Sequence, residues 1–243
     1  MSNQAINIGF LLFPKLTQLD LTGPVQVLSR MPGAKVHLIW KTLDPVPSDT
    51  PISILPTMKM SECPQLDVIC VPGGSGADDM ANDEEVLDFL RKQADGARYV
   101  TSVCTGALVL GAAGLLDGYK ATTYWAVLDD LKKFGATPVE TRVCTDRNRI
   151  TGGGVTAGID FGLVMIDTIA GRKAAEAVQL ALEYNPAPPF SSGSPHTAPA
   201  DVLAMVRQRM TPFIEKRAQA ITRAATRFRE RQQVGAQSKS GVS

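Results

Sequence analysis

Cysteine and histidine are scarce in this chain of 243 residues. The four cysteines are far apart and form no C-x-x-C pair, so we expect neither a disulfide framework nor a metal cluster. Only two histidines, His37 and His196, are present to act as acid–base partners for a thiol. The cysteines are Cys63, Cys70, Cys104 and Cys144.

The chain also lacks a charge imbalance and any long apolar run. Its 25 Lys and Arg against 24 Asp and Glu leave a net charge of +1, which gives no electrostatic attraction to nucleic acid or to an anionic membrane. The apolar run near the N-terminus is far too short to span a bilayer, and no basic segment precedes it. We therefore expect a cytoplasmic protein without a targeting segment, and without nucleic acid or membrane as partners.

Short apolar runs alternate with helical patterns along the first half of the chain. Such runs are typical of strands that are buried on both faces of a parallel sheet. The alternation predicts an α/β fold with a doubly wound, mostly parallel sheet flanked by helices. The expected strands are residues 6–13, 35–41, 67–74 and 98–104, with a short accessory strand at 52–57.

The second half ends in two segments of unusual composition. Residues 185–199 are interrupted throughout by proline, so they form an irregular arm, whereas residues 200–233 have a long and basic helical pattern. Because no groove-reading motif accompanies the basic residues, we favour a solvated or packing helix over a nucleic-acid-binding one. The expected units are an α/β domain (1–184), the proline-rich arm (185–199), a C-terminal helix that packs on the domain or on a dimer partner (200–233) and a disordered tail (234–243).

Candidate functional residues gather at the carboxyl ends of the expected strands, where open α/β sheets bind ligands. Asp20 follows the first strand, Gly73 and Gly74 end the third, and Cys104 ends the fourth. A sharp strand-to-helix turn would expose the Cys104 thiol, and the following helix N-terminus would lower its pKa. The N–H groups of the glycine turn would stabilise an anion beside it. Cys104 is therefore a candidate nucleophile.

Each of these residues also has a purely structural interpretation. Cys104 alone fits a small buried residue, Asp20 alone fits a helix N-cap, and the glycines alone mark a tight turn. His37 lies within a strand pattern and His196 within the arm, so Asp20 is the favoured partner of the thiol. A carboxyl group beside a thiolate in a partly dry pocket has a raised pKa, which suits a general acid.

Four motifs resemble the ThiJ/PfpI superfamily, which has the class I glutamine amidotransferase-like, flavodoxin-like fold. They are PGG at 72–74, SVCTGALVLGAAGLLDG at 102–118, ATTYW at 121–125 and GGGVTAGIDFGL at 152–163. A narrower likeness, which includes EYNPAPPF at 183–190, is to the isocyanide-hydrating enzymes of this superfamily. It extends from about residue 6 to about residue 228.

The resemblance implies that a homodimer hydrates isocyanides, R–N≡C, to N-substituted formamides without a metal or an organic cofactor. Cys104 would attack the terminal carbon and form a thioimidate. Asp20 would supply and accept protons. Thr105 would shape the substrate pocket, and Gly73 and Gly74 would offer N–H donors to the substrate.

Two features leave alternatives open. Tyr124 stands where many members of the superfamily have histidine, which weakens a protease-like or amidase-like activity and leaves Tyr124 as a packing residue or a hydrogen-bond donor. The chain also fits a sensing domain without turnover. One form would be the ligand-binding half of a transcription regulator, although the residues after the arm offer one long helix in place of helix-turn-helix units. Another would be a redox sensor in which Cys104 is oxidised.

Overall fold

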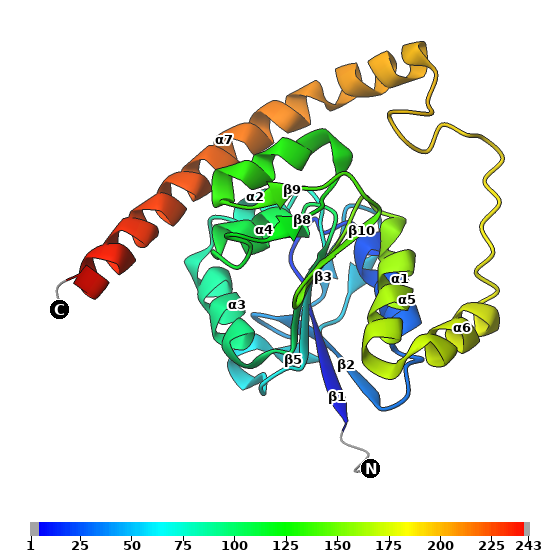
Figure 1. Cartoon of the computed structure of the whole chain (residues 1–243), viewed down its shortest axis with the longest axis horizontal. Coiled ribbons are helices and arrows are strands. Elements are labelled where there is room, and N and C mark those ends of the chain that lie inside the picture. Colours follow the sequence, from blue (N-terminus) through cyan, green and yellow to red (C-terminus); the bar gives the residue numbers. More distant parts are fainter. Residues whose placement is uncertain (1–4, 241–243) are drawn as a thin grey trace.

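A central sheet between two layers of helices organises the molecule, which is known from a computed structural model that describes residues 5–240 (Figure 1). Within that range the main sheet has seven strands in the order β10-β11-β7-β6-β1-β2-β5, and only the β10–β11 pair is antiparallel. The doubly wound, mostly parallel fold predicted from the sequence is confirmed. The strands are β1 (Ile6–Leu11), β2 (Ala34–Trp40), β5 (Met58–Lys59), β6 (Val68–Val71), β7 (Tyr99–Val103), β10 (Val143–Asp146) and β11 (Arg149–Gly152), with small ribbons of β3 (Val46–Pro47) with β4 (Ser53–Ile54) and β8 (Lys120–Ala121) with β9 (Thr137–Pro138).

Helices cover both faces of the sheet (Figure 1). One layer contains α1 (Gln18–Leu28), α5 (Ala157–Ala170) and α6 (Arg172–Ala181), and the other contains α2 (Ala77–Met80), α3 (Glu84–Gly96) and α4 (Gly106–Ala112). Two 3₁₀ segments, η1 (Met60–Glu62) and η2 (Trp125–Phe134), complete the connections. Because both faces are covered, all four residues of β6 are buried, which explains its continuous apolar sequence.

The order of the strands determines where the sheet can bind a ligand. The connection from β1 runs through α1 to β2 on one side, whereas the connection from β6 runs through α3 to β7 on the other side. Neighbouring strands β1 and β6 therefore diverge at a topological switch point, and a crevice forms at their carboxyl ends. The segments after β1, β6 and β7 all reach this crevice.

The C-terminal helix, α7 (Ala200–Ser240), crosses the domain over α4 and η2 (Figure 1). Its buried stripe follows helical spacing and includes an edge-on contact of Phe228 with Phe134, whose ring centroids are 6.0 Å apart. The stripe consists of Ala220, Ile221, Ala224, Ala225 and Phe228. The helix therefore packs on its own domain.

The helix also continues beyond Gln233, where we expected a disordered tail. No proline follows Gln233 to stop the helix. Residues 241–243 of that expected tail lie outside the described residues. No helix within residues 5–240 combines the length and the apolar character needed to cross a membrane.

The arginines of α7 contact the domain. Arg227 donates to the carbonyl oxygen of Asn82 (3.0 Å), and Arg231 donates to Glu84 (3.0 Å) and to the carbonyl oxygen of Ala112 (2.6 Å). The sequence left a solvated and a packing helix open, and these basic residues contribute to the docking of the helix on the α3–α4 layer.

Candidate functional site

Cys104 lies at a strained turn directly after β7. Its φ angle of 55° is in the left-handed region, which residues other than glycine rarely adopt. Three hydrogen bonds hold the turn: its N–H donates to the carbonyl oxygens of Gly152 (3.0 Å) and Gly153 (2.9 Å), and its own carbonyl accepts from the Thr123 hydroxyl (2.7 Å). The predicted sharp turn at Cys104 is therefore present, and its geometry is fixed by the loops after β8 and β11.

Asp20 lies in the first turn of α1 and is fully buried. Its Oδ2 atom accepts a hydrogen bond from the N–H of Gly73 (3.0 Å), and the same carboxyl group interacts with the thiol of Cys104. The N-cap of α1 is Thr17, so the alternative that Asp20 only caps the helix is wrong. The carboxyl group and the thiol form a buried pair, as their positions after β1 and β7 predicted.

Burial raises the pKa of Asp20 to about 7, because the charged carboxylate loses its hydration. The hydrogen bonds from the Cys104 thiol and from the N–H of Gly73 oppose this rise only in part. The direction is the one expected from the sequence. Asp20 therefore changes its protonation state near neutral pH.

The pKa of the Cys104 thiol differs from the sequence-based expectation. Burial raises it, the negative charge of Asp20 raises it further, and the N–H of Thr105 lowers it only partly. Helix α4 is short, Gly106–Ala112, and a helix N-terminus contributes about 1 kcal/mol, which is small against the desolvation of a buried thiolate. The pair thus loses its first proton near pH 7 and keeps its second proton to much higher pH.

The glycine turn after β6 is used inside the protein. The N–H of Gly73 holds Asp20, and the N–H of Gly74 donates to the hydroxyl of Thr105 (3.0 Å), which in turn donates to the carbonyl oxygen of Gly74 (3.1 Å). We expected both N–H groups to face a substrate. They are instead already paired, because the buried Asp20 and Thr105 side chains need partners.

A side chain at Gly73 is expected to disrupt the pair. A Cβ atom there would lie 2.6 Å from the Thr105 backbone nitrogen and 2.7 Å from Asp20 Oδ2, so Gly73→Ala must displace one of them. We expect this variant to change the alkylation rate of Cys104 by iodoacetamide about tenfold or more, because displacing Asp20 lowers the pKa of the thiol and displacing the Thr105 N–H raises it. Gly23→Ala is the matched control, since its Cβ would make an ordinary contact at 3.4 Å. Equal alkylation rates in the two variants would contradict the packing described here.

We expected the turn to expose the thiol, but the side chain of Cys104 is buried, and a cavity of about 270 Å³ adjoins it. Of the three residues predicted to bind substrate, Gly74 and Thr105 line this cavity and Gly73 does not. Helix α7 forms one of its walls. The lining residues are Thr17, Gly74, Ser75, Cys104, Thr105, Tyr124, Val155, Met210, Phe213 and Arg217. Met210, Phe213 and Arg217 of α7 were not predicted from the sequence, in which the likeness that extends to about residue 228 was the only signal for them.

Arg217 connects α7 to the glycine turn. Its Nε donates to Asp78 Oδ1 (2.6 Å) and its Nη2 donates to the carbonyl oxygen of Gly74 (3.0 Å). Both partners of the ion pair are well shielded, with side chains 14% and 9% exposed. The residue was not distinguishable in the sequence from the other arginines of the helix.

Arg217→Ala is expected to lower the free energy of unfolding by about 3 kcal/mol, because it leaves the carboxylate of Asp78 buried without its partner. The measurement is urea unfolding followed by circular dichroism. Arg172→Ala is the control: its ion pair with Glu176 is exposed, so we expect a loss below about 1 kcal/mol. Similar losses in both variants would show that Arg217 contributes no more than a surface ion pair.

Tyr124 combines the two roles that the sequence left open. Its hydroxyl donates to Met210 Sδ (3.4 Å), and its ring packs against Gly154, where a Cβ would lie only 2.9 Å from the ring. The two histidines lie elsewhere: His37 Nε2 is 3.1 Å from Asn7 Oδ1, and His196 belongs to the arm. In the described part of the chain, no cluster of three or more His, Cys, Asp or Glu side chains is arranged to hold a metal ion.

The fold and the cysteine turn define a known class of protein. Residues 7–168 match the family model of the DJ-1/PfpI family, and the chain belongs to this family. Over 224 residues it is 55% identical to the isonitrile hydratase of Pseudomonas putida, an alignment that covers 92% of this chain and 98% of that protein.

Other relatives share parts of the chain. A ThiJ/PfpI family protein from Pseudomonas syringae has a crystal structure that superposes with a TM-score of 0.87 at 46% identity, covering 89% of this chain and 90% of that one. The HTH-type transcriptional regulator GbdR of Pseudomonas aeruginosa is 33% identical over 181 residues, which are 71% of this chain and 49% of the regulator. The likeness to the regulator is therefore confined to about half of it.

Proposed function

We propose that this protein hydrates isocyanides to N-substituted formamides. The identity of 55% to an isonitrile hydratase, over nearly the full length of both chains, is the observation that carries the proposal. The buried pair of Asp20 and Cys104 at the switch point of the sheet supports it, because the reaction needs a nucleophile and a proton carrier at one carbon atom.

The first step of the proposed mechanism joins the substrate to Cys104. In its active form the pair of Cys104 and Asp20 holds one proton. This proton moves to the terminal carbon of R–N≡C while the sulfur of Cys104 bonds to the same carbon. The product is the thioimidate R–N=CH–S–Cys104, and Asp20 remains as a carboxylate.

Water completes the reaction. Asp20 takes a proton from a water molecule as the water oxygen bonds to the thioimidate carbon, and it passes this proton to the substrate nitrogen. The proton left on the new hydroxyl group is the one that returns to the pair. The C–S bond then breaks, the pair regains its single proton, and R–NH–CHO leaves. The water supplies the formamide oxygen. Thr105 and Gly74 contribute by shaping the cavity, and Gly73 by holding Asp20 beside the thiol.

The direct test is incubation of the protein with phenyl isocyanide in a buffer that contains a metal chelator. We expect N-phenylformamide to form in many turnovers, with one atom of ¹⁸O per product when the reaction is run in labelled water. A rate no higher than that of the buffer would overturn the proposal. Loss of turnover on chelation would contradict the expectation that no metal is needed.

The likeness to a transcription regulator supports a second candidate, a sensing domain without turnover. A ligand-sensing domain that acts on DNA would shift genomic fragments in a mobility assay, and a redox sensor would accumulate sulfinic acid at Cys104 without formamide. The likeness to the isonitrile hydratase over nearly the full length of both chains, against about half of the regulator, favours the enzyme.

The proposal includes an assembly and a location. We infer a cytoplasmic homodimer in which the unit 1–184 carries the chemistry, the arm 185–199 connects it to the C-terminal helix, and residues 200–233 dock on the domain. Light scattering coupled to size-exclusion chromatography tests the dimer: a mass of twice the 26.0 kDa chain is expected.

A further inference from the structure

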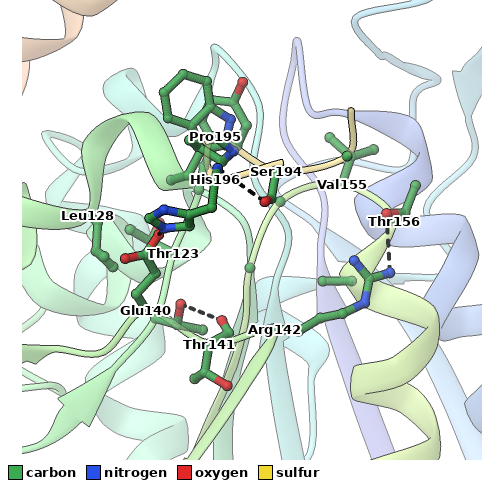
Figure 2. A pocket seen from close by; sticks show the side chains of 17 residues that line it. Thr123, Leu128, Glu140, Thr141, Arg142, Val155, Thr156, Ser194, Pro195 and His196 are labelled. Atoms are coloured by element: carbon green, nitrogen blue, oxygen red, sulfur yellow. Dashed lines mark hydrogen bonds and ion pairs between the residues drawn. The ribbon is translucent and has the colours of Figure 1, made fainter. Parts of the chain in front are cut away.

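A second and larger cavity, of about 440 Å³, adjoins the cavity of Cys104. We call it the outer cavity. Figure 2 shows Leu128, Glu140 and His196 along one side of it, and Arg142 and Thr156 along the other. The arm closes the cavity with residues 193–196. Nothing in the proposed mechanism uses this space.

The outer cavity has a fixed position relative to the thiol. Tyr124 and Val155 line both cavities, so they form the boundary between them. The loops that carry these residues are hydrogen-bonded directly to the backbone of Cys104, through the hydroxyl of Thr123 (2.7 Å) and the carbonyl oxygen of Gly153 (2.9 Å). A molecule bound to Cys104 is therefore next to the outer cavity.

The lining of the outer cavity changes from apolar to charged. Tyr124 and Trp125 form a tilted ring pair with centroids 5.6 Å apart, and Leu128 and Pro195 add further apolar surface. At the open rim, His196 Nε2 lies 2.6 Å from Glu140 Oε1, and both side chains are mostly exposed. Such a site suits a flat apolar group whose far end reaches water.

The geometry of an isocyanide points toward this space. The R–N≡C group is linear, so the substituent R extends straight away from the carbon atom that bonds to Cys104. Packing behind the thiol leaves no room, because a Cβ on Gly73 would already lie 2.8 Å from Cys104 Cβ. Helix α7 closes another side with Met210 and Arg217. The side lined by Tyr124 and Val155 borders the larger volume.

We infer that the outer cavity is the subsite for the organic substituent, and that the protein accepts isocyanides with extended aromatic groups that pack on Trp125. This inference rests on the proposed function and deepens it. The arm would then contact the substrate, because its residues 193–196 form a wall of the outer cavity. The substrate class is an aryl isocyanide with a second ring.

The test compares 4-biphenylyl isocyanide with methyl isocyanide, which is too small to reach the outer cavity. The readout is the ratio of their kcat/KM values. We expect Trp125→Ala, and independently Ser194→Trp, which fills the cavity, to lower this ratio about tenfold relative to wild type. Trp125→Phe should restore most of it. Phe190→Ala is the control, because Phe190 lies on the arm outside the cavity and is 79% exposed.

A ratio that stays at the wild-type value in both Trp125→Ala and Ser194→Trp would overturn the inference. Structural damage alone would lower kcat/KM for both substrates alike and leave the ratio unchanged. If the wild type hydrates neither substrate, the proposed function fails instead. Binding then decides the subsite separately: N-(4-biphenylyl)formamide should quench the fluorescence of Trp125 in a Trp40→Phe background. An unchanged emission at millimolar formamide would count against the subsite.

Discussion

Replacing Cys104 by alanine is expected to lower the kcat for formamide formation by about 10⁴-fold or more, because the thioimidate cannot form without the sulfur. The turn that carries Cys104 is held by backbone hydrogen bonds and by the Thr123 hydroxyl, so the variant keeps the fold. The measurement is chromatographic detection of the formamide. In the wild type, rapid acid quenching during turnover should also trap a mass increase of one isocyanide on the peptide that contains Cys104.

Cys63→Ala is the matched control for this result. Cys63 is half-buried beside Gln93, remote in the fold from the cavity, and burial raises the pKa of its thiol to about 11. We expect this variant to retain wild-type turnover. Substantial formamide production by the Cys104→Ala variant would remove the covalent mechanism, even if the hydratase activity itself remained.

Asp20→Asn should lower kcat/KM by about 10²- to 10⁴-fold, because the proton carrier is lost while the acceptor for the N–H of Gly73 is retained. In the wild type, the active form of the pair holds one proton. It appears when the pair loses its first proton, so kcat/KM should rise with pH through a pKa of about 7 and then level off. The variant should show no such rise. The pH profile measured from pH 5 to 9 provides the check.

The same carboxyl group should also affect stability with pH. Its pKa is raised from 3.8 in the unfolded chain to about 7 in the folded protein, so the folded state binds more protons between these values. The contribution of this group to the free energy of unfolding is fully present below pH 4. About 4 kcal/mol of it is lost as the pH rises through 7. The difference between the free energy of unfolding of Asp20→Asn and that of the wild type should therefore shift in favour of the variant as the pH rises.

Asp129→Asn serves as the control for both measurements, since its carboxyl group is 86% exposed in an i,i+3 pair on η2. It should follow the wild type in activity and in stability. If the wild-type pH profile were flat between pH 5 and 9, or if Asp20→Asn shared its rise, then Asp20 would not carry the transferred proton.

Much of the site was predictable because it depends on local patterns and on sheet topology. The apolar run of β6 and the alternation of strands and helices predict a parallel sheet, and a parallel sheet brings the residues after β1 and β7 to one edge. This reasoning alone places Asp20 beside Cys104. The direction of the Asp20 pKa shift was predicted from the same placement, because a carboxyl group beside a thiol in a partly dry pocket loses hydration.

Other features depend on contacts that no local pattern reveals. The wall formed by Met210, Phe213 and Arg217 comes from a segment more than a hundred residues beyond Cys104. The pairing of the Gly73 and Gly74 N–H groups depends on which side chains are buried beside them. The raised pKa of the Cys104 thiol follows from the completeness of its burial, and a sequence gives no measure of that.

Because α7 forms one wall of the cavity, some residues that shape the space around the thiol come from a different part of the chain than the residues that react. The reacting groups come from residues 20–105, while residues 210–217 decide how much space surrounds them. Exchanging Met210 or Phe213 therefore changes the space around the thiol, whereas Arg217 has to be kept because it holds the carbonyl of Gly74 and the carboxylate of Asp78. For protein engineering, Met210 and Phe213 are the positions of this helix at which the space around the thiol can be varied while the contacts of Arg217 with the domain are kept.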